Sequence, residues 1–145
     1  MGGQDIKFTE DNIVMGRKFC NKIWNASRFV MLQTAKLKMK SEKLKITNKN
    51  LKLTNADRKI LKSLDKTIKA VNKSLQDFQF GQAARALYDF FWHDFCDVYI
   101  EKSKSEIRNP KFETKKILLY ILLNSLKLLH PFIPFITEEI YQTLP

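Results

Sequence analysis

Residues with potential chemistry gather near the N-terminus, in the stretch GRKFCNKIWNASRF from Gly16 to Phe29. On a helical wheel its apolar residues share one face and its polar residues the other. Phe29 falls on the polar face, opposite the expected core. An aromatic ring set among cations and amides can stack on an unpaired base while its neighbours bind phosphates. Packing of Phe29 beneath the segment that follows Leu32 is the alternative. The polar residues of this face are Lys18, Asn21, Lys22, Asn25 and Arg28.

A second set of reactive residue types, His93 and Cys96, lies three positions apart in another helical pattern. Cys20 is the only plausible third ligand, and the spacing matches no zinc motif. A Cys–His nucleophile would also lack a recognisable local sequence. We therefore predict no metal site and no catalytic residue, and we interpret both cysteines as small core or near-core residues.

Composition limits the remaining possibilities. The 145 residues suit one domain, and 44% hydrophobic residues can bury a core. Four glycines and no glycine-rich loop argue against nucleotide binding, so we expect no cofactor in this chain. Lys and Arg outnumber Asp and Glu by 26 to 15, for a net charge of +11. This charge favours a polyanionic partner, without deciding between nucleic acid and an anionic membrane.

The apolar periodicity predicts an all-α fold, an antiparallel helical bundle of four to five helices. Thr9 and Thr54 are the expected N-caps of the first two helices, Thr54 in a capping box with Asp57. Between Lys36 and Lys52, seven lysines without a helical period predict a basic loop or short hairpin. The expected helices run from Glu10 to about Leu32, from Asn55 to Phe78, from Gly81 to about Lys102, from Glu113 to Leu129, and from Pro134 onward.

The second expected helix has two opposite stripes. The apolar stripe, which ends at Phe78, should face the core, and the third helix should likewise turn Ala84 and Val98 inward. The other stripe is a row of lysines, interpreted either as a solvated face or as a set of phosphate contacts. Its members are Lys59, Lys62, Lys66, Lys69 and Lys73.

Localisation signals are weak. The longest strongly apolar run, from Ile117 to Leu123, is too short to cross a bilayer, so no membrane span is expected. The N-terminal residues contain no apolar stretch typical of a signal peptide. Two cysteines within helical patterns suit a reducing compartment, and we predict a cytoplasmic monomer.

Four separated segments, in order over almost the whole chain, resemble the anticodon-binding domain of valyl-tRNA synthetases. They are GRKFCNKIWNASRFV, NADRKIL, ALYDFFWHDFCDVYIE and LHPFIPFITEEIY. The resemblance implies a class I parent enzyme that joins valine to its tRNA with ATP and magnesium. This chain has no counterpart of the catalytic and editing domains, so we expect it to bind the valine tRNA anticodon stem-loop and to catalyse nothing. We expect the domain to span residues 4–145, with Met1–Gly3 as a remnant of expression cloning.

The same resemblance assigns tRNA contacts to Lys22, Arg28 and Phe29, and helical geometry adds Arg17, Asn21 and Asn25. Gly81 and Lys59 differ from the residues that relatives often have there, which leaves the docking of the second and third helices open. The sister isoleucyl and leucyl enzymes share the helical domain. A freestanding basic helical adaptor that binds an acidic protein or a membrane surface is the alternative from another class.

Overall fold

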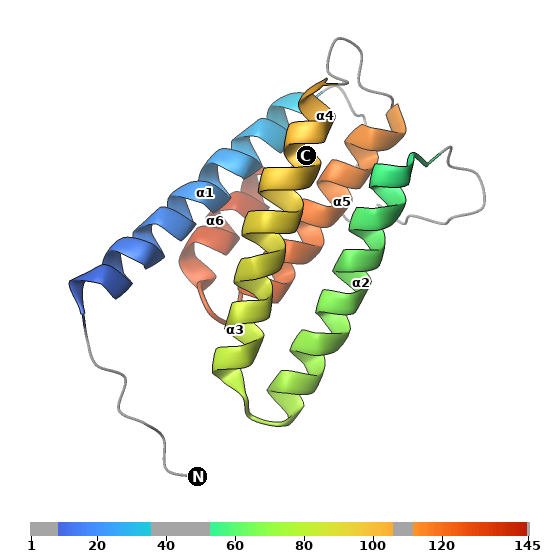
Figure 1. The fold of residues 1–145 in the computed structure, drawn as a ribbon. Helices are drawn as coiled ribbons and strands as arrows, with labels where there is room; N and C mark the ends of the chain where they lie inside the picture. Colours follow the sequence, from blue (N-terminus) through green and yellow to red (C-terminus); the bar gives the residue numbers. More distant parts are fainter. Residues whose placement is uncertain (1–8, 36–52, 106–111, 145) are drawn as a thin grey trace.

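The computed structural model describes residues 9–35, 53–105 and 112–144, and the regular structure in these ranges is entirely helical (Figure 1). Helices α3, η2 and α4 follow one another without a break, so the described residues form five helical rods. This confirms the prediction of an all-α bundle of four to five helices. The loop or hairpin expected between Lys36 and Lys52 lies outside the described residues. The elements are α1 (Glu10–Thr34), α2 (Asn55–Gln76), α3 (Phe80–Asp89), η2 (Phe90–Ile100), α4 (Glu101–Ser105), α5 (Phe112–Leu129) and α6 (Pro134–Thr143).

The start of α2 is fixed by a buried carboxylate. Thr54 and Asp57 form the predicted capping box, in which the Asp57 amide donates to Thr54 Oγ1 at 3.2 Å and the Thr54 amide donates to Asp57 Oδ2 at 2.8 Å. The other Asp57 oxygen accepts the hydroxyl of Tyr99, on η2, at 2.6 Å. One side chain therefore both caps α2 and ties it to the neighbouring helix.

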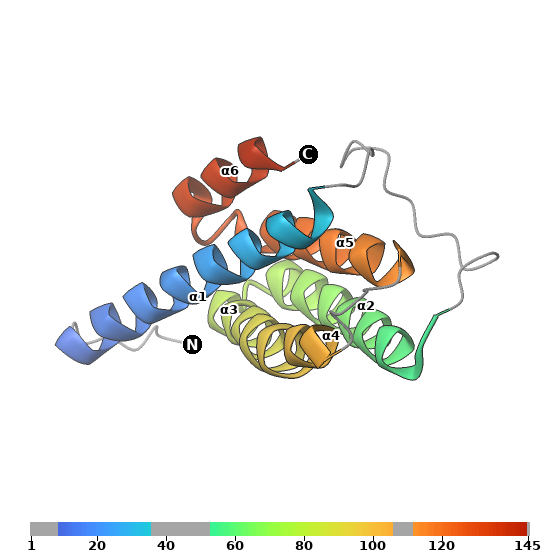
Figure 2. The same cartoon turned by 90° about the horizontal axis from the view of Figure 1, so that it is seen from above.

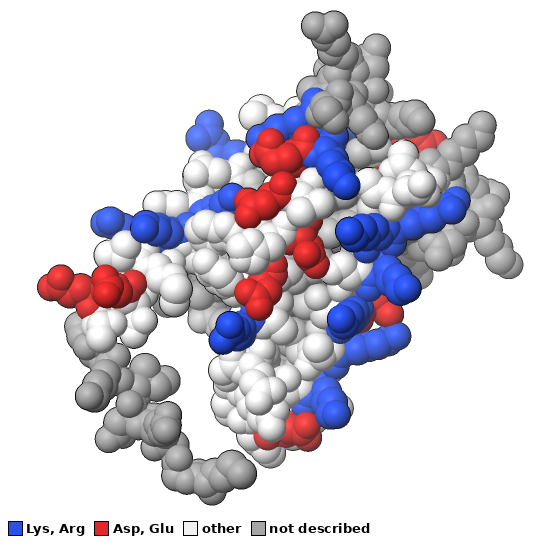
Figure 3. Space-filling model, in the orientation of Figure 1, with Lys and Arg blue, Asp and Glu red and all other residues white. Residues whose placement is uncertain are grey.

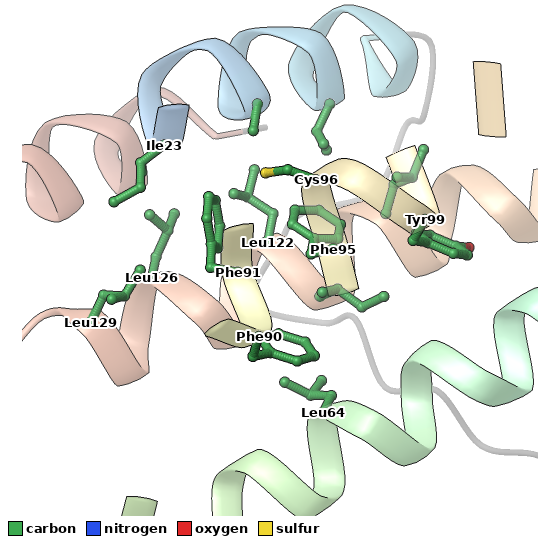
Figure 4. Close-up of a cluster of buried hydrophobic side chains, with 14 of the residues drawn as sticks. Ile23, Leu64, Phe90, Phe91, Phe95, Cys96, Tyr99, Leu122, Leu126 and Leu129 are labelled. Atoms are coloured by element: carbon green, nitrogen blue, oxygen red, sulfur yellow. The ribbon is translucent and has the colours of Figure 1, made fainter. Parts of the chain in front are cut away.

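The third rod differs from the regular α-helix expected there, because its central part, η2, is π-helical. A π-helix has more residues per turn than an α-helix, so side chains four apart come closer to alignment. The rings of Phe91 and Phe95 lie 5.5 Å apart, and those of Phe95 and Tyr99 lie 6.4 Å apart. This row of rings is buried in the core (Figure 4).

Helix α5 is the centre of the bundle, as its almost wholly apolar sequence predicted. It packs against α1, α2 and α3 as well as α6, and α1 crosses between α6 and the layer that contains α2, α3 and η2 (Figure 2). Buried side chains from α1, α2, η2 and α5 meet in one cluster (Figure 4). The buried residues of α5 include Ile117, Leu118, Leu119, Ile121, Leu122, Leu126 and Leu129. No helix in the described ranges is long and apolar enough to cross a membrane.

Some residues expected in the core are exposed. The N-terminal turns of α1 extend beyond the other helices (Figure 2), and Ile13, placed by the wheel on the core face, is 52% exposed. Helix α2 ends before Phe78, whose backbone takes a positive φ of 55° and whose side chain is 79% exposed. Ala84 and Val98 are also exposed. The periodicity predicted which face of each helix is apolar. It did not predict which parts of that face other helices cover.

Candidate nucleic-acid interface

The six predicted contact residues lie on α1 in two adjacent rows. The outer row consists of Arg17, Asn21, Asn25 and Arg28, which are all exposed. Their spacing of three and four residues keeps them on one side of the helix over about 16 Å. The inner row consists of Lys22 and Phe29, which are half-buried and turned toward η2 and α4. The helix therefore offers an accessible polar row beside an inner row of one cation and one ring.

The helical wheel predicted that Phe29 lies opposite the core. In the structure it does not. Its ring is half-buried and packs against the hydrophobic core cluster. The reason is that α4 continues the third rod past this point, so that α1 is covered on a second side. Lys104 of α4 lies over the ring, with Nζ 5.6 Å from its centroid, and also binds Glu101 Oε1 at 2.6 Å. Phe29 is thus a wall of a groove and not an isolated surface ring.

This groove is a depression of about 160 Å³ between α1 and the end of the third rod. Phe29 and the stem of Lys22 supply its α1 side, while Ile100 and Lys104 supply the opposite side. A depression with an aromatic wall and cations at its rim can accept one flat base, with the negatively charged phosphates of its backbone near the cations. Its lining residues are Lys22, Asn25, Ala26, Phe29, Cys96, Ile100, Glu101 and Lys104.

Lys22 is held by the protein itself. Its Nζ lies 2.8 Å from Asp97 Oδ1 and 5.0 Å from the centre of the Trp92 ring. The hydrogen bond to Asp97 raises the pKa of Lys22, and the same bond lowers the pKa of Asp97. The other Asp97 oxygen lies 3.4 Å from His93 Nδ1. Lys22 is therefore a fixed, fully charged group whose field is partly offset by a neighbouring carboxylate.

The cysteines are placed as their small-core interpretation predicted, with Cys96 buried and Cys20 half-buried. Burial raises the pKa of the Cys96 thiol to about 12, which keeps it protonated at neutral pH. Thiol protonation removes nucleophilic and metal-ligating character. Within the described ranges, no three His, Cys, Asp or Glu side chains are grouped so that they could hold a metal ion.

Sequence reasoning missed the groups on the far side of the groove. Asp97, Glu101 and Lys104 lie about 75 residues from Lys22 and Phe29, and no local pattern links such distant positions. Only a regular spacing along the third rod was visible: three acids and a histidine, Asp89, His93, Asp97 and Glu101, follow one another at intervals of four residues. In the folded chain this spacing produces a row, because the π-helical turns bring such residues toward alignment.

On one face of the molecule the charged side chains are segregated by sign. In Figure 3 the acidic groups of the third rod form a band, with basic groups of α1 on one side and of α2 on the other. The net charge of +11 is therefore not a uniform field. A polyanion would meet two basic regions separated by the acidic band.

The comparisons with known proteins agree with this geometry. Residues 57–145 match the family described as the anticodon-binding domain of tRNA ligases, and the chain belongs to that family. The groove described above thus lies on a chain whose family is named for anticodon binding.

The chain is also similar over 99% of its length to valine–tRNA ligases. It is 43% identical to that of Bacillus thuringiensis subsp. konkukian over 147 residues and 44% identical to that of Pseudothermotoga lettingae over 144 residues. It is 42% identical to that of Symbiobacterium thermophilum over 147 residues. In each case it spans 16% of the relative's length.

Proposed function

We propose that this chain is the anticodon-binding domain of a valine–tRNA ligase and binds the anticodon stem-loop of the tRNA that accepts valine. The observation that carries the proposal is the groove at Phe29 in a chain that is 42–44% identical to valine–tRNA ligases along its whole length. The similarity favours the valine enzyme over the sister isoleucyl and leucyl enzymes. The domain spans residues 4–145 in this proposal.

The two rows on α1 divide the work of recognition. An unpaired anticodon base stacks against the accessible side of Phe29, while Lys104 and Lys22 attract the flanking phosphates. The exposed amides of Asn21 and Asn25 can donate to and accept from base edges. Arg17 and Arg28 stand at opposite ends of the outer row and contact the backbone or a base. Stacking supplies affinity, and the amides supply the discrimination between anticodons.

The parent enzyme attaches valine to tRNA with ATP and magnesium, in the cytoplasm. This part of it contributes RNA binding and not aminoacylation, because the nucleotide chemistry belongs to domains that its residues do not resemble. The pure chain, a monomer, should therefore show no valine-dependent pyrophosphate exchange. Detectable exchange would contradict this division of labour.

The test is a set of binding isotherms at fixed salt. The RNAs are a valine anticodon stem-loop, the same stem-loop with altered anticodon bases, and isoleucine and leucine anticodon stem-loops. We expect the valine stem-loop to bind at least tenfold more tightly than the others, since a lost base contact typically costs about 1–3 kcal/mol. Equal affinity for all four RNAs, or tighter binding to vesicles of anionic lipid, would overturn the proposal in favour of a general basic adaptor.

A further inference from the structure

Two depressions flank the end of the third rod, and each contains a lysine of α4. The first is the groove at Phe29, where Lys104 lies over the ring. The second, of about 90 Å³, lies between α2 and η2 and is lined by Lys59 of α2 and Lys102 of α4. Lys102 and Lys104 are two residues apart, so α4 carries cations from one depression to the other.

The second depression continues into the N-terminal part of the α2 lysine row. Arg58, Lys59 and Lys62 are exposed there within five residues. We define the α4 belt as these three residues together with Lys102 and Lys104. At α4 the belt lies next to the acidic groups of the third rod, and there Lys104 binds Glu101.

The remainder of the α2 row has a different character. Lys69 is bound to Asp65 at 2.8 Å, as Lys104 is to Glu101 at 2.6 Å, but neither Lys69 nor Lys73 lines either of the two depressions. Lys73 lies in the last turn of α2, 14 residues or about 21 Å along the helix from Lys59 and close in sequence to Asp77. By charge alone, the five lysines of the row are equivalent. The N-terminal part of the row differs from the rest because it borders a depression.

Resting on the proposed function, we propose that the α4 belt binds the sugar–phosphate backbone of the same RNA whose unpaired base stacks on Phe29. The RNA strand leaves the groove at Phe29, crosses α4 between Lys104 and Lys102, and reaches Lys59 and Lys62. One carboxylate, Asp94, lines the second depression and accepts the Ser63 hydroxyl, so the backbone follows the lysine side of that depression. The belt reads no sequence, because phosphates are the same at every position.

The experiment compares two double variants with the same loss of charge. Lys59→Gln/Lys102→Gln removes one cation from each side of the second depression, and Lys69→Gln/Lys73→Gln removes two from the far end of α2. All four side chains are exposed, and thermal melts check that both proteins fold. The probe is the valine anticodon stem-loop, titrated between 50 and 300 mM salt alongside the stem-loop with altered anticodon bases.

We expect the belt variant to bind both stem-loops roughly tenfold or more weakly at 0.1 M salt, because two lost phosphate contacts reduce the slope of log K against log salt by about 1.4–1.8. The ratio between the two RNAs should stay unchanged. The affinity of the control variant should fall by less than about twofold. Its two lysines would not touch the RNA, and attraction between separated charges is screened within about 10 Å at this salt.

Equal losses from the two variants would overturn the belt, because the lysines would then act only through net charge. A selective loss of binding to phosphatidylserine vesicles, without the selective loss for RNA, would also overturn it and assign these lysines to a membrane surface. The anticodon discrimination of the unmodified chain tests the proposed function separately, so failure of the belt and failure of the function give different results.

Discussion

Helices α1 and α2 have 25 and 22 residues and both expose a row of polar or basic side chains, yet they differ in what lies beside the row. On α1 the row borders a groove with a half-buried ring and a lysine fixed by an ion pair. On α2 the N-terminal part of the row borders a smaller depression of about 90 Å³, and the row itself consists of lysines. The comparison teaches that charge brings a polyanion to both helices, whereas the groove at α1 offers a partly exposed ring and the depression at α2 has only the buried ring of Tyr99.

The largest expected effect concerns how α2 is anchored. Asp57→Ala removes the capping box and leaves the buried Tyr99 hydroxyl without this acceptor, which should cost about 2–4 kcal/mol of unfolding free energy. Urea denaturation measures the change. The matched control is Asp65→Ala, on the exposed side of the same helix, which should cost less than about 1 kcal/mol. Similar costs for the two variants would show that α2 is not held through Asp57.

The next prediction concerns the ring on α1. Phe29→Ala should weaken binding of the valine stem-loop by about 1–3 kcal/mol through lost stacking. Because the ring is half-buried against the core, the variant should also lose some thermal stability, though less than the roughly 3–5 kcal/mol of a fully buried phenylalanine. Phe80→Ala, at a ring that is 55% exposed on α3, is the control and should leave RNA binding unchanged.

Binding and stability must be separated for Phe29. A large drop in melting temperature, with undiminished discrimination by the protein that remains folded, would make Phe29 a packing residue only. The stacking role would then be wrong, and the groove would have to recognise RNA through its cations alone.

Much of this arrangement follows from local sequence. The capping box at Thr54, the apolar surround of α5 and the proline at the start of α6 each depend on residues within a few positions, and all were predictable. The groove could not be predicted, because it depends on where α4 lies against α1. The wheel placed Phe29 correctly relative to its own helix and wrongly relative to the fold. The π-helical form of η2 likewise has no signal in the periodicity.

A third prediction separates a point charge from a shaped contact on the polar face of α1, at the exposed Lys18 and Arg28. Lys18→Ala should weaken binding by less than about 1 kcal/mol and lower the salt slope by about 0.7–0.9, the value for one phosphate. Arg28→Ala should match it if Arg28 contacts only phosphate. If Arg28 binds a base edge, its loss should instead reduce the discrimination between anticodons, as for Phe29→Ala. Salt titrations with both stem-loops measure the two quantities, and an unchanged slope for Lys18→Ala would contradict an electrostatic role for this face.

The smallest expected effect is at the ion pair that fixes Lys22. Asp97→Asn should cost about 0.2–1 kcal/mol of stability at neutral pH, since both partners are partly exposed. The lowered pKa of Asp97 sets the sign of the pH dependence: the pair stabilises the fold above the unfolded aspartate pKa near 3.9 and loses this contribution as acid protonates the folded carboxylate. The raised pKa of Lys22 preserves the pair through neutral pH.

Because His93 also contacts Asp97, the measurement belongs in a His93→Gln background, which removes that contact. The stability difference between this protein and its Asp97→Asn derivative should stay constant from about pH 5 to 8 and shrink below pH 4. The same change removes a negative charge beside the groove, so it should tighten RNA binding at low salt. Weaker binding would contradict this and would mean that Asp97 contributes by holding Lys22 in position. In that case the α1 groove would depend on an acidic residue of the third rod, whereas, in the described ranges, the exposed lysine row of α2 forms no ion pair with an acidic residue of another helix.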